Sequence, residues 1–377
     1  MAAEVFELIT SVNLGGAENV AFELARHCTV QGERGRLVVV ELFRSKGDYA
    51  QRKRQELEQA GIRVLTLSPL GKRPSMLFAP LALAWMLVRR RPAVVHAHTD
   101  LPDWVLAGAL RLLRLFRRPL PKVMRTIHNV ALWPTHPRLG TLVETALRDD
   151  AIAAVSEAAL QAYGELRRSR GLPLADLRSV VYNGCALPVP RPLPFDLDAN
   201  RCHIAFCGRF DQQKGIDALC PMVQAIQRQF PGRFVFHFIG AGPLQHLLDT
   251  LAQQAPDVRV HGPIPGVAAV LHAFDYLVMP SRFEGLPLVA IEAALAGVPV
   301  MAARAPGLTE TLPQDWPLYF DLASPPTLLR LFQGVAQGEL DRRALAKKAR
   351  AFALERFGLA TMINHYERLF ARLVQTP

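Results

Sequence analysis

The chain has 377 residues, of which 50% are hydrophobic and 20% are charged; this composition excludes a disordered or fibrous protein and favours about two globular domains. The formal net charge is +11, and residues 1–185 alone carry 26 basic and 17 acidic side chains, so the first half is expected to meet an anionic partner unless its arginines simply face solvent. Five cysteines without C-x-x-C spacing argue against a disulfide framework or a structural zinc site.

The N-terminal segment and the most apolar run decide the expected compartment. Glu4 to Thr10 has no basic flank and no long apolar core, so it is predicted to be a strand and the protein to be cytoplasmic. The run Met76–Val88 contains Pro80 and precedes Arg89–Arg91, and it is shorter than the roughly 20 apolar residues that a membrane span needs. We predict a buried crossover helix here; the alternative is a helix lying on the inner face of the cytoplasmic membrane.

Short runs rich in Val and Ile alternate with longer segments of helical periodicity, such as Ala17–Val30, in both halves of the chain. This rhythm predicts an α/β fold with parallel sheets that are covered by helices. The predicted strands are Val5–Thr10, Leu37–Phe43, Val64–Leu67, Ala93–His98, Val123–His128, Ile152–Ser156 and Val180–Tyr182 in the first half, and Ile204–Phe206, Phe234–Ile239, Val258–His261, Tyr276–Met279 and Val298–Ala302 in the second.

A proline-rich stretch separates the two halves. Prolines alternate with other residues from Pro188 to Pro194, which predicts a stiff linker. We predict a first domain over residues 1–185, a linker over 186–200 and a second domain over 201–357. Open α/β sheets bind ligands at the carboxyl ends of their strands, so a site is expected in a cleft between the two domains.

The first half offers a glycine turn and three histidines. Gly15 and Gly16 follow the first predicted strand and open a helix, where a phosphate could approach the backbone. His96, His98 and His128 end predicted strands, and the first two share a strand face, but no carboxylate or cysteine spacing completes a metal site. Structural roles and substrate contact both remain open for the three histidines.

His128 is the best candidate for substrate contact, because Thr126-Ile127-His128-Asn129 ends a strand at the expected site. We expect its neutral imidazole to donate a hydrogen bond to a sugar hydroxyl or a backbone oxygen. His98 and Asn129 are candidates for binding a second substrate, the acceptor of a transferred group.

Two cations and two acids mark the second half. Arg209 and Lys214 follow a strand and could neutralise a diphosphate, although surface charge is an equal alternative. Glu284 lies just before a helix that Pro287 helps to start, and Glu292 lies about two turns inside it. They could bind sugar and ribose hydroxyls; the alternative is one acid near the helix dipole and one in solvent.

With these motifs, the chain resembles glycosyltransferase family 4, whose members have a GT-B fold and retain the anomeric configuration. The resemblance covers nearly the whole chain, and the E-x7-E spacing of Glu284 and Glu292 is its most specific part. Two departures are Pro287, where glycine is frequent, and Arg304-Ala305-Pro306-Gly307, which replaces the usual Gly-Gly. The other motifs are Gly15-Gly16-Ala17-Glu18, Thr126-Ile127-His128, Val181-Tyr182-Asn183-Gly184, Gly208-Arg209-Phe210, Lys214-Gly215 and Ile239-Gly240-Ala241-Gly242-Pro243.

The resemblance implies two Rossmann-like domains that face each other across a cleft, with residues 358–377 forming a helix that packs back on the first domain. It implies His128, Arg209, Lys214 and Glu284 as the catalytic set. The donor-binding residues that it implies are Gly15, Gly16, Arg209, Lys214, Ile264, Glu284, Gly285, Leu286, Pro287, Leu288 and Glu292.

The implied function is transfer of a sugar from a nucleotide-diphosphate sugar to a glycan or lipid-linked acceptor, as in bacterial cell-surface polysaccharide or lipopolysaccharide synthesis. No D-x-D element is present, so no metal or other cofactor is expected. The alternatives are a sugar-nucleotide epimerase or hydrolase of the same architecture and a non-catalytic anion-binding protein. Nucleic acid is not an expected partner, because basic clusters with interleaved aromatics are absent. The apolar and basic segment Trp104–Arg118, together with Arg89–Arg91, could rest on an anionic membrane, or it could be an ordinary crossover helix.

Overall fold

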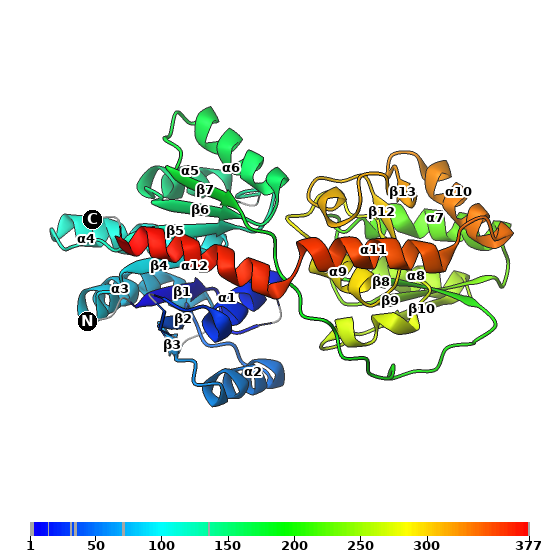
Figure 1. The fold of residues 1–377 in the computed structure, drawn as a ribbon, viewed down its shortest axis with the longest axis horizontal. Coiled ribbons are helices and arrows are strands. Elements are labelled where there is room, and N and C mark those ends of the chain that lie inside the picture. Colours follow the sequence, from blue (N-terminus) through cyan, green and yellow to red (C-terminus); the bar gives the residue numbers. More distant parts are fainter. Residues whose placement is uncertain are drawn as a thin grey trace. The chain divides into compact units, whose positions relative to one another are not determined.

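The computed structural model describes residues 4–13, 15–30, 32–33, 36–69, 72–134 and 136–375. They form two compact units: unit 1 comprises Met1–Gly184 and Leu359–Pro377, and unit 2 comprises Cys185–Gly358. Each unit is built on one parallel sheet with helices packed against it (Figure 1). The predicted α/β class with two Rossmann-like sheets is therefore confirmed.

Unit 1 contains a seven-stranded sheet in the order β3-β2-β1-β4-β5-β6-β7. Its central strands are mostly buried hydrophobic runs joined by crossover helices, as expected where a parallel sheet is covered on both faces, and the edge strands β3 and β7 are partly exposed. The strands are β1 (Val5–Ile9), β2 (Leu37–Glu41), β3 (Val64–Thr66), β4 (Val94–His98), β5 (Lys122–Ile127), β6 (Ala151–Ala154) and β7 (Leu177–Val180). The helices are α1 (Gly16–His27), α2 (Asp48–Gln59), α3 (Lys72–Arg90), α4 (Asp100–Leu115), α5 (Pro137–Ala146), α6 (Glu157–Ser169) and α12 (Leu359–Gln375).

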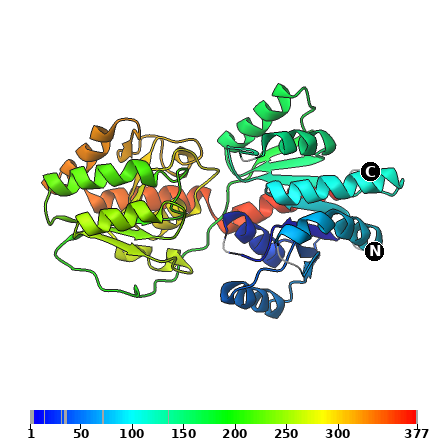
Figure 2. The same cartoon turned by 180° about the vertical axis from the view of Figure 1, so that it is seen from behind.

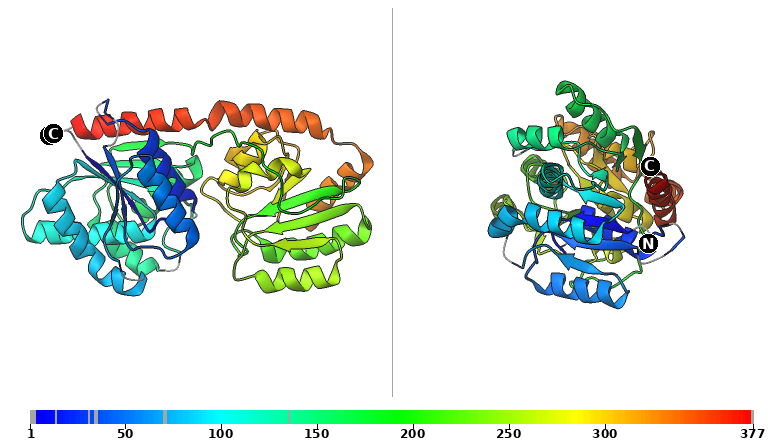
Figure 3. Two further views of the ribbon diagram at one scale, coloured as in Figure 1. Left: turned by 90° about the horizontal axis from the view of Figure 1, so that it is seen from below. Right: turned by 90° about the vertical axis from the view of Figure 1, so that its left-hand side faces the viewer.

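The last helix of the chain belongs to the core of unit 1. Its buried side chains, including Met362, Tyr366 and Phe370, join one hydrophobic cluster with α1 and with Val5 and Ile9 of β1. Alternate residues of β1 point to the opposite face, where they join α3 and α4 in a second cluster. Figure 3 shows α12 running along the sheet of this unit.

The helices α3 and α4 pack against each other behind the sheet (Figure 2). A Cβ atom on Gly108 would lie 2.9 Å from the Cβ of Pro80, so the glycine permits this close approach. The helix α4 is a crossover helix, one of the two alternatives left open for Trp104–Arg118, and its Val105, Leu106, Ala109, Leu110 and Leu113 are buried.

Only one face of the helix α3 is buried, although the sequence predicts a buried crossover helix at Met76–Val88. One of its faces is buried through Ala79, Leu83 and Leu87, but Leu81 and Trp85 on the other face are exposed by 57% and 62%. Hydropathy alone could not separate the two faces, because both are apolar. None of the described helices combines the length and the apolar character that crossing a bilayer demands.

Unit 2 contains a six-stranded sheet in the order β10-β9-β8-β11-β12-β13. Its strands are β8 (Cys202–Cys207), β9 (Phe234–Ile239), β10 (Val258–His261), β11 (Tyr276–Met279), β12 (Val300–Ala303) and β13 (Tyr319–Phe320). Its helices are α7 (Ile216–Gln229), α8 (Gln245–Gln254), α9 (Leu288–Leu295), α10 (Pro325–Gln337) and α11 (Arg342–Arg356), with short 3-10 turns at Val267–Ala269, Leu271–Ala273 and Thr309–Thr311.

The predicted linker, residues 186–200, is part of unit 2 and packs on its sheet beside a row of histidines. The Phe195 ring stacks on His261 with centroids 3.9 Å apart, and His203 Nε2 lies 2.8 Å from the Asp198 carbonyl oxygen, to which it donates. The row continues from His203 Nδ1 to His237 Nε2 at 2.9 Å. The stretch that the sequence predicts as a linker is therefore held to the sheet of unit 2.

Candidate functional site

Four loops meet at the carboxyl ends of the central strands of unit 2. The loop after β8 bonds to the loop after β9, since Phe210 N donates to the Ala241 carbonyl over 3.0 Å. The loop after β11 bonds to the loops after β8 and β12, through Arg282 N to Gln213 O at 2.9 Å and Glu284 N to Pro306 O at 3.0 Å. The predicted motifs of the second half are thus brought together at one sheet edge, where α/β sheets bind ligands.

Glycines allow these loops to approach so closely. Gly215 has a φ of 72°, and a Cβ atom there would lie 2.0 Å from the Pro280 carbonyl oxygen. Gly307 has a φ of 73°, and a Cβ atom there would lie 2.2 Å from the Glu284 carbonyl oxygen. Any other residue at either position would push the loops apart.

The structure pairs two of the predicted catalytic residues with each other. Lys214 Nζ lies 2.7 Å from Glu284 Oε1, and the Ser281 hydroxyl donates to the same oxygen over 2.6 Å. Glu284 is 5% exposed, so the carboxylate is compensated by one cation and one hydroxyl in a nearly buried position. Ser281 is a partner that the sequence interpretation missed, although it stands three residues before Glu284.

Arg209 lies at the surface of the same loop cluster. Its side chain is 70% exposed, with Asp211 3.4 Å away as an ion-pair partner. An exposed guanidinium gains little from such a pair and keeps its donors available for a ligand. The two predicted diphosphate contacts therefore differ: Lys214 is already engaged, and Arg209 is open to solvent.

Glu292 lies inside α9, as predicted, with Gly285, Leu286 and Pro287 in the loop before it and Leu288 as the first helical residue. Pro287 is the cap of this helix and not its first residue. Burial raises the pKa of Glu292 to about 7. A ligand hydroxyl that donated a hydrogen bond to this carboxylate would stabilise its charged form. Ile264 lies in the loop after β10.

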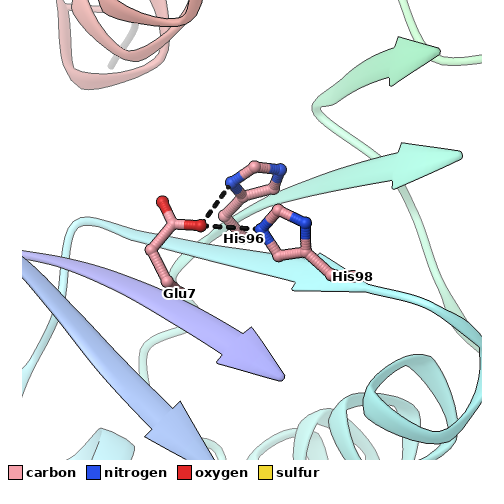
Figure 4. Close-up of side chains that lie close together, drawn as sticks. All are labelled: Glu7, His96 and His98. Atoms are coloured by element: carbon pink, nitrogen blue, oxygen red, sulfur yellow. Dashed lines mark hydrogen bonds and ion pairs between the residues drawn. The ribbon is translucent and has the colours of Figure 1, made fainter. Parts of the chain in front are cut away.

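In unit 1 the three histidines form a row of close polar contacts with an acid from the neighbouring strand, in which His98 is hydrogen-bonded to the acid and His96 makes an ion-pair contact with it. Glu7 of β1 pairs in register with His96 of β4, and its Oε2 lies 2.9 Å from His96 Nδ1 and 2.7 Å from His98 Nε2 (Figure 4). His98 Nδ1 lies 3.0 Å from His128 Nε2. Beyond His96, the row continues to Thr126 Oγ1 at 2.7 Å.

This arrangement changes the interpretation of His98. His98 is a candidate for acceptor binding from the sequence, but its side chain is 1% exposed and both ring nitrogens already have partners. One ring nitrogen of His98 bonds to His128 and the other bonds to Glu7, so neither nitrogen is left for a ligand.

The structure also corrects the expectation that no carboxylate accompanies His96 and His98. Glu7 supplies one from a strand 89 residues earlier, and the three donor atoms lie within 4.8 Å of one another, an arrangement that could hold a metal ion. Among the residues that the structure describes, this is the one such group. Sequence spacing could not reveal it, because the strand pairing that brings Glu7 to His96 is a tertiary contact.

His128 and Asn129 line a cavity of about 300 Å³ in unit 1. Thr10, Thr99 and Trp133 also line it. Thr99 and Trp133 have φ angles of 80° and 56°, which is rare for residues with a side chain and rarest for a β-branched one. Such backbone strain is often found at ligand sites. The cavity is therefore the candidate acceptor pocket, and Thr99 and Trp133 are wall residues that the sequence interpretation missed.

The predicted glycine turn stands at the first residue of α1. Gly15 caps the helix in an extended conformation, with a φ of −154°, and Gly16 begins the helix. A Cβ atom on Gly15 would lie 2.1 Å from the Glu18 carboxylate, so the glycine leaves room for this side chain. Burial raises the pKa of the Glu18 carboxyl.

Two family models match the chain. Residues 14–187 match "Glycosyltransferase Family 4", and residues 201–321 match "Glycosyl transferases group 1". The chain is 28% identical over 255 residues to a glycogen synthase of Mycobacterium tuberculosis, covering 59% of this chain and 54% of that protein. It is 30% identical over 235 residues to an uncharacterized 41.2 kDa protein of the Klebsiella pneumoniae cps region, covering 58% and 62%. The chain thus spans about half the length of the curated relatives that it matches.

Solved structures match over almost the whole chain. The Anabaena protein HepE in complex with UDP-glucose superposes with a TM-score of 0.76 at 20% identity, covering 99% of this chain and 100% of that one. The lipopolysaccharide outer core galactosyltransferase WaaB superposes with a TM-score of 0.69 at 15% identity, covering 98% and 99%. At these identities, the likeness establishes the fold. Together with the two family models, it shows that the chain belongs to the family 4 glycosyltransferases and has the GT-B fold.

Proposed function

We propose that this protein transfers a sugar, with retention of anomeric configuration, from a nucleotide-diphosphate sugar to a glycan or lipid-linked acceptor. The observation that carries the proposal is the meeting of Arg209, Lys214, Glu284 and the start of α9 at one sheet edge of unit 2. Cations, free backbone N–H groups and a compensated carboxylate are the groups that a diphosphate joined to a sugar requires.

Each group has a distinct part in the proposed reaction. The exposed guanidinium of Arg209 and the ammonium of Lys214 would stabilise the charge that develops on the leaving diphosphate. Glu284 would accept hydrogen bonds from sugar hydroxyls, and Glu292 from the ribose. In this scheme a donor phosphate oxygen accepts the proton of the attacking hydroxyl, as in the family's usual account, and the two cations do the work that a metal ion would otherwise do.

The donor and the chemistry can be tested together. We expect UDP or UDP-glucose, the ligands named for the Anabaena structures, to raise the Tm of the protein if either is a donor or a donor product. A panel of other nucleotide sugars extends the screen, and product analysis with and without acceptor separates transfer from epimerisation or hydrolysis. A chelator should leave the turnover unchanged. The proposal would be contradicted if no nucleotide sugar raised the Tm of the protein, or if the protein isomerised its donor without an acceptor.

We further propose that the acceptor is lipid-linked and that unit 1 rests on anionic lipid. A surface that we call the α3 patch consists of apolar side chains that are exposed on α3. Arg89 lies over the Trp85 ring at 5.1 Å, and Arg91 and Arg118 line one small cavity beside the patch, so a basic rim borders it. Apolar side chains with a basic rim are typical of helices that lie on anionic membranes. The α3 patch comprises Leu77, Phe78, Leu81, Trp85 and Val88.

A role in cell-surface polysaccharide or lipopolysaccharide synthesis would agree with such an acceptor. Its support comes from the names of the relatives: the cps-region protein of Klebsiella, the galactosyltransferase WaaB, and an O-antigen biosynthesis glycosyltransferase of Escherichia coli that is 25% identical over 173 residues.

Vesicle sedimentation tests the lipid proposal. The wild-type protein should sediment with phosphatidylcholine vesicles that contain phosphatidylglycerol and should remain free with phosphatidylcholine alone. Trp85→Glu should weaken the binding, since it places a negative charge in the α3 patch, whereas Leu354→Glu on α11, where Leu354 is also 50% exposed, should not. Binding that ignores either the lipid charge or the Trp85 substitution would exclude the α3 patch as the contact.

A further inference from the structure

The buried row from Glu7 to His128 has an order that fixes where its protons lie. Burial alone would raise the pKa of the Glu7 carboxyl, but the neighbouring His96 and the hydrogen bond from His98 lower it to about 2. Glu7 is therefore ionised and can only accept hydrogen bonds. Because His98 Nε2 lies 2.7 Å from Glu7 Oε2, this nitrogen must carry a proton and donate it.

The position of the proton on His98 decides which ring donates in the hydrogen bond between His98 and His128. Burial and the neighbouring His96 lower the pKa of His98 to about 4, although Glu7 opposes this shift, so the ring is neutral near pH 7. A neutral imidazole with its proton on Nε2 has a bare Nδ1. That nitrogen lies 3.0 Å from His128 Nε2 and must accept, so the proton of this bond belongs to His128.

His128 is also neutral, because burial and the two neighbouring histidines lower its pKa well below the ordinary value. Its Nε2 is the donor toward His98, and its Nδ1 is therefore a bare lone pair. We propose that Glu7 and His98 are positioning residues that hold His128 as the Nε2–H tautomer, so that Nδ1 accepts a hydrogen bond from a substrate hydroxyl. This inference rests on the proposed function and sharpens it.

The Nε2–H tautomer reverses the expected hydrogen bond between His128 and the ligand: the sequence predicts His128 as the donor, and in this tautomer Nδ1 is the acceptor. A bare Nδ1 cannot donate to a sugar or backbone oxygen, and it can only receive the O–H of a hydroxyl group. The ligand must therefore bring its proton to His128, which favours a sugar hydroxyl over a carbonyl or a phosphate oxygen in that position. A histidine whose second nitrogen is fixed by a carboxylate is a common way to set a tautomer.

The alternative use of the cluster is metal binding. The two nitrogens lie 2.7 and 2.9 Å from Glu7 Oε2, and the side chains of all three residues are at most 1% exposed. The His98 contact is a hydrogen bond, whereas the His96 contact is an ion-pair contact only, so His96 Nδ1 and Glu7 Oε1 are buried without a hydrogen-bond partner among the described residues. A metal ion held there would take His98 Nε2 away from its hydrogen bond to Glu7, so the hydrogen-bonded row and a metal site exclude each other. The row from Glu7 through His98 to His128 needs only the hydrogen bonds that are already present.

The test uses Glu7→Gln in the full chain. The glutamine amide can donate to His98 Nε2, which lets the His98 proton move to Nδ1 and reverses the bond to His128. Nitrogen NMR of labelled histidine rings, recorded without substrate, should show His128 as the Nε2–H form in the wild type and as the Nδ1–H form or a mixture in the variant. We expect kcat for transfer to fall by about 10²-fold while the donor KM stays close to the wild-type value.

A matched control lies at the other end of the same network. Tyr366 is buried, and its hydroxyl lies 3.0 Å from Thr126 Oγ1 on the branch that leads through His96 and away from His128. Tyr366→Phe also removes one buried hydrogen bond, so it should lower the Tm but should leave the His128 tautomer and kcat unchanged. If Glu7→Gln does not fold, His98→Gln interrupts the row at its middle and should give the same loss of kcat.

Three results would overturn the assignment. The first is an Nδ1–H form of His128 in the wild type. The second is a Glu7→Gln or His98→Gln variant that turns over at the wild-type rate. The third is stoichiometric Zn²⁺ binding that Glu7→Gln or His96→Gln abolishes, because the cluster would then be a metal centre. Since the tautomer is measured without substrate, a protein that shows the Nε2–H form yet transfers no sugar would contradict the proposed function alone.

Discussion

At the scale of single residues, Arg209 and Lys214 hold similar charges in different surroundings. Lys214 is 17% exposed and bonded to Glu284, whereas Arg209 is 70% exposed. A buried pair is costly to break on one side, because the remaining charge loses its partner, while an exposed arginine contributes little to stability. The two cations therefore differ in what they do for the fold, even if both meet the same diphosphate.

This difference gives a prediction for two variants. Arg209→Ala should leave the Tm unchanged and weaken binding of the nucleoside diphosphate by about 10-fold or more, with little effect on the nucleoside. Lys214→Ala should weaken the same binding and also lower the Tm. Calorimetric titration and thermal unfolding measure the two effects. Arg282→Ala is the control, since Arg282 stands in the neighbouring loop but pairs with Asp217. Equal losses for the nucleoside and its diphosphate would remove both cations from the phosphate site.

At the scale of elements, the helix α12 completes unit 1 from the far end of the sequence. Six of its side chains are buried in the core of that unit, and Thr29 N donates to Glu367 over 2.7 Å. The chain enters and leaves unit 2 at adjacent points, because Cys185 N donates to the Phe357 carbonyl over 2.9 Å. Unit 1 is therefore discontinuous in sequence, and its core depends on a helix that follows the whole of unit 2.

Removal of this helix should unfold unit 1. Each large buried side chain that is lost costs about 2–5 kcal/mol, so the six together cost about 12–30 kcal/mol, which equals or exceeds most of the roughly 5–15 kcal/mol by which a domain is stable. Residues 1–184 alone should show no cooperative melting by circular dichroism. Joining 1–184 to 359–375 through a short Gly/Ser linker should restore a cooperative transition. A stable fragment 1–184 would show that α12 is dispensable for the fold of unit 1.

At the scale of the whole molecule, both units keep buried histidines neutral. The pKa of His98 is lowered to about 4 in unit 1, mainly by burial, and the pKa of His237 is lowered to about 3 in unit 2 by burial and by His203 and His261. Below about pH 6.5 the unfolded chain takes up protons at these residues that the folded chain does not, so each one reduces the free energy of unfolding as the pH falls. Glu292, whose pKa is raised to about 7 by burial, opposes this trend.

A difference between variants isolates the histidine contribution. From pH 7 down to pH 4.5, the free energy of unfolding of His237→Gln should fall less steeply than that of the wild type. The window stays above the range in which Glu7, with its lowered pKa, loses its own contribution. Urea titrations at several pH values provide the measurement. His246→Gln, at an exposed position on α8, should follow the wild-type slope. Parallel curves for His237→Gln and the wild type would show that His237 is as easily protonated in the folded chain as in the unfolded one.

Local sequence patterns were sufficient to predict the central strands of both sheets. Buried strands are continuous runs of Val, Ile and Leu, and their alternation with helical segments predicts parallel sheets. The edge strands were harder: β7 lies at Leu177–Val180 instead of Val180–Tyr182, and the two-residue β13 was not predicted. Edge strands are short or partly exposed, so their hydrophobic pattern is weak.

The sequence by itself determined the two α/β units, the glycine turns and the positions of Arg209, Lys214 and Glu284, because these follow from periodicity and from motifs within short segments. Only the tertiary structure decided that Lys214 pairs with Glu284, and that Glu7 stands behind His128 through His98. The physical reason is that strand order and register are set by packing of the whole sheet. Residues 70 or 91 positions apart meet only after the sheet has formed, and no local pattern records which of them will face each other.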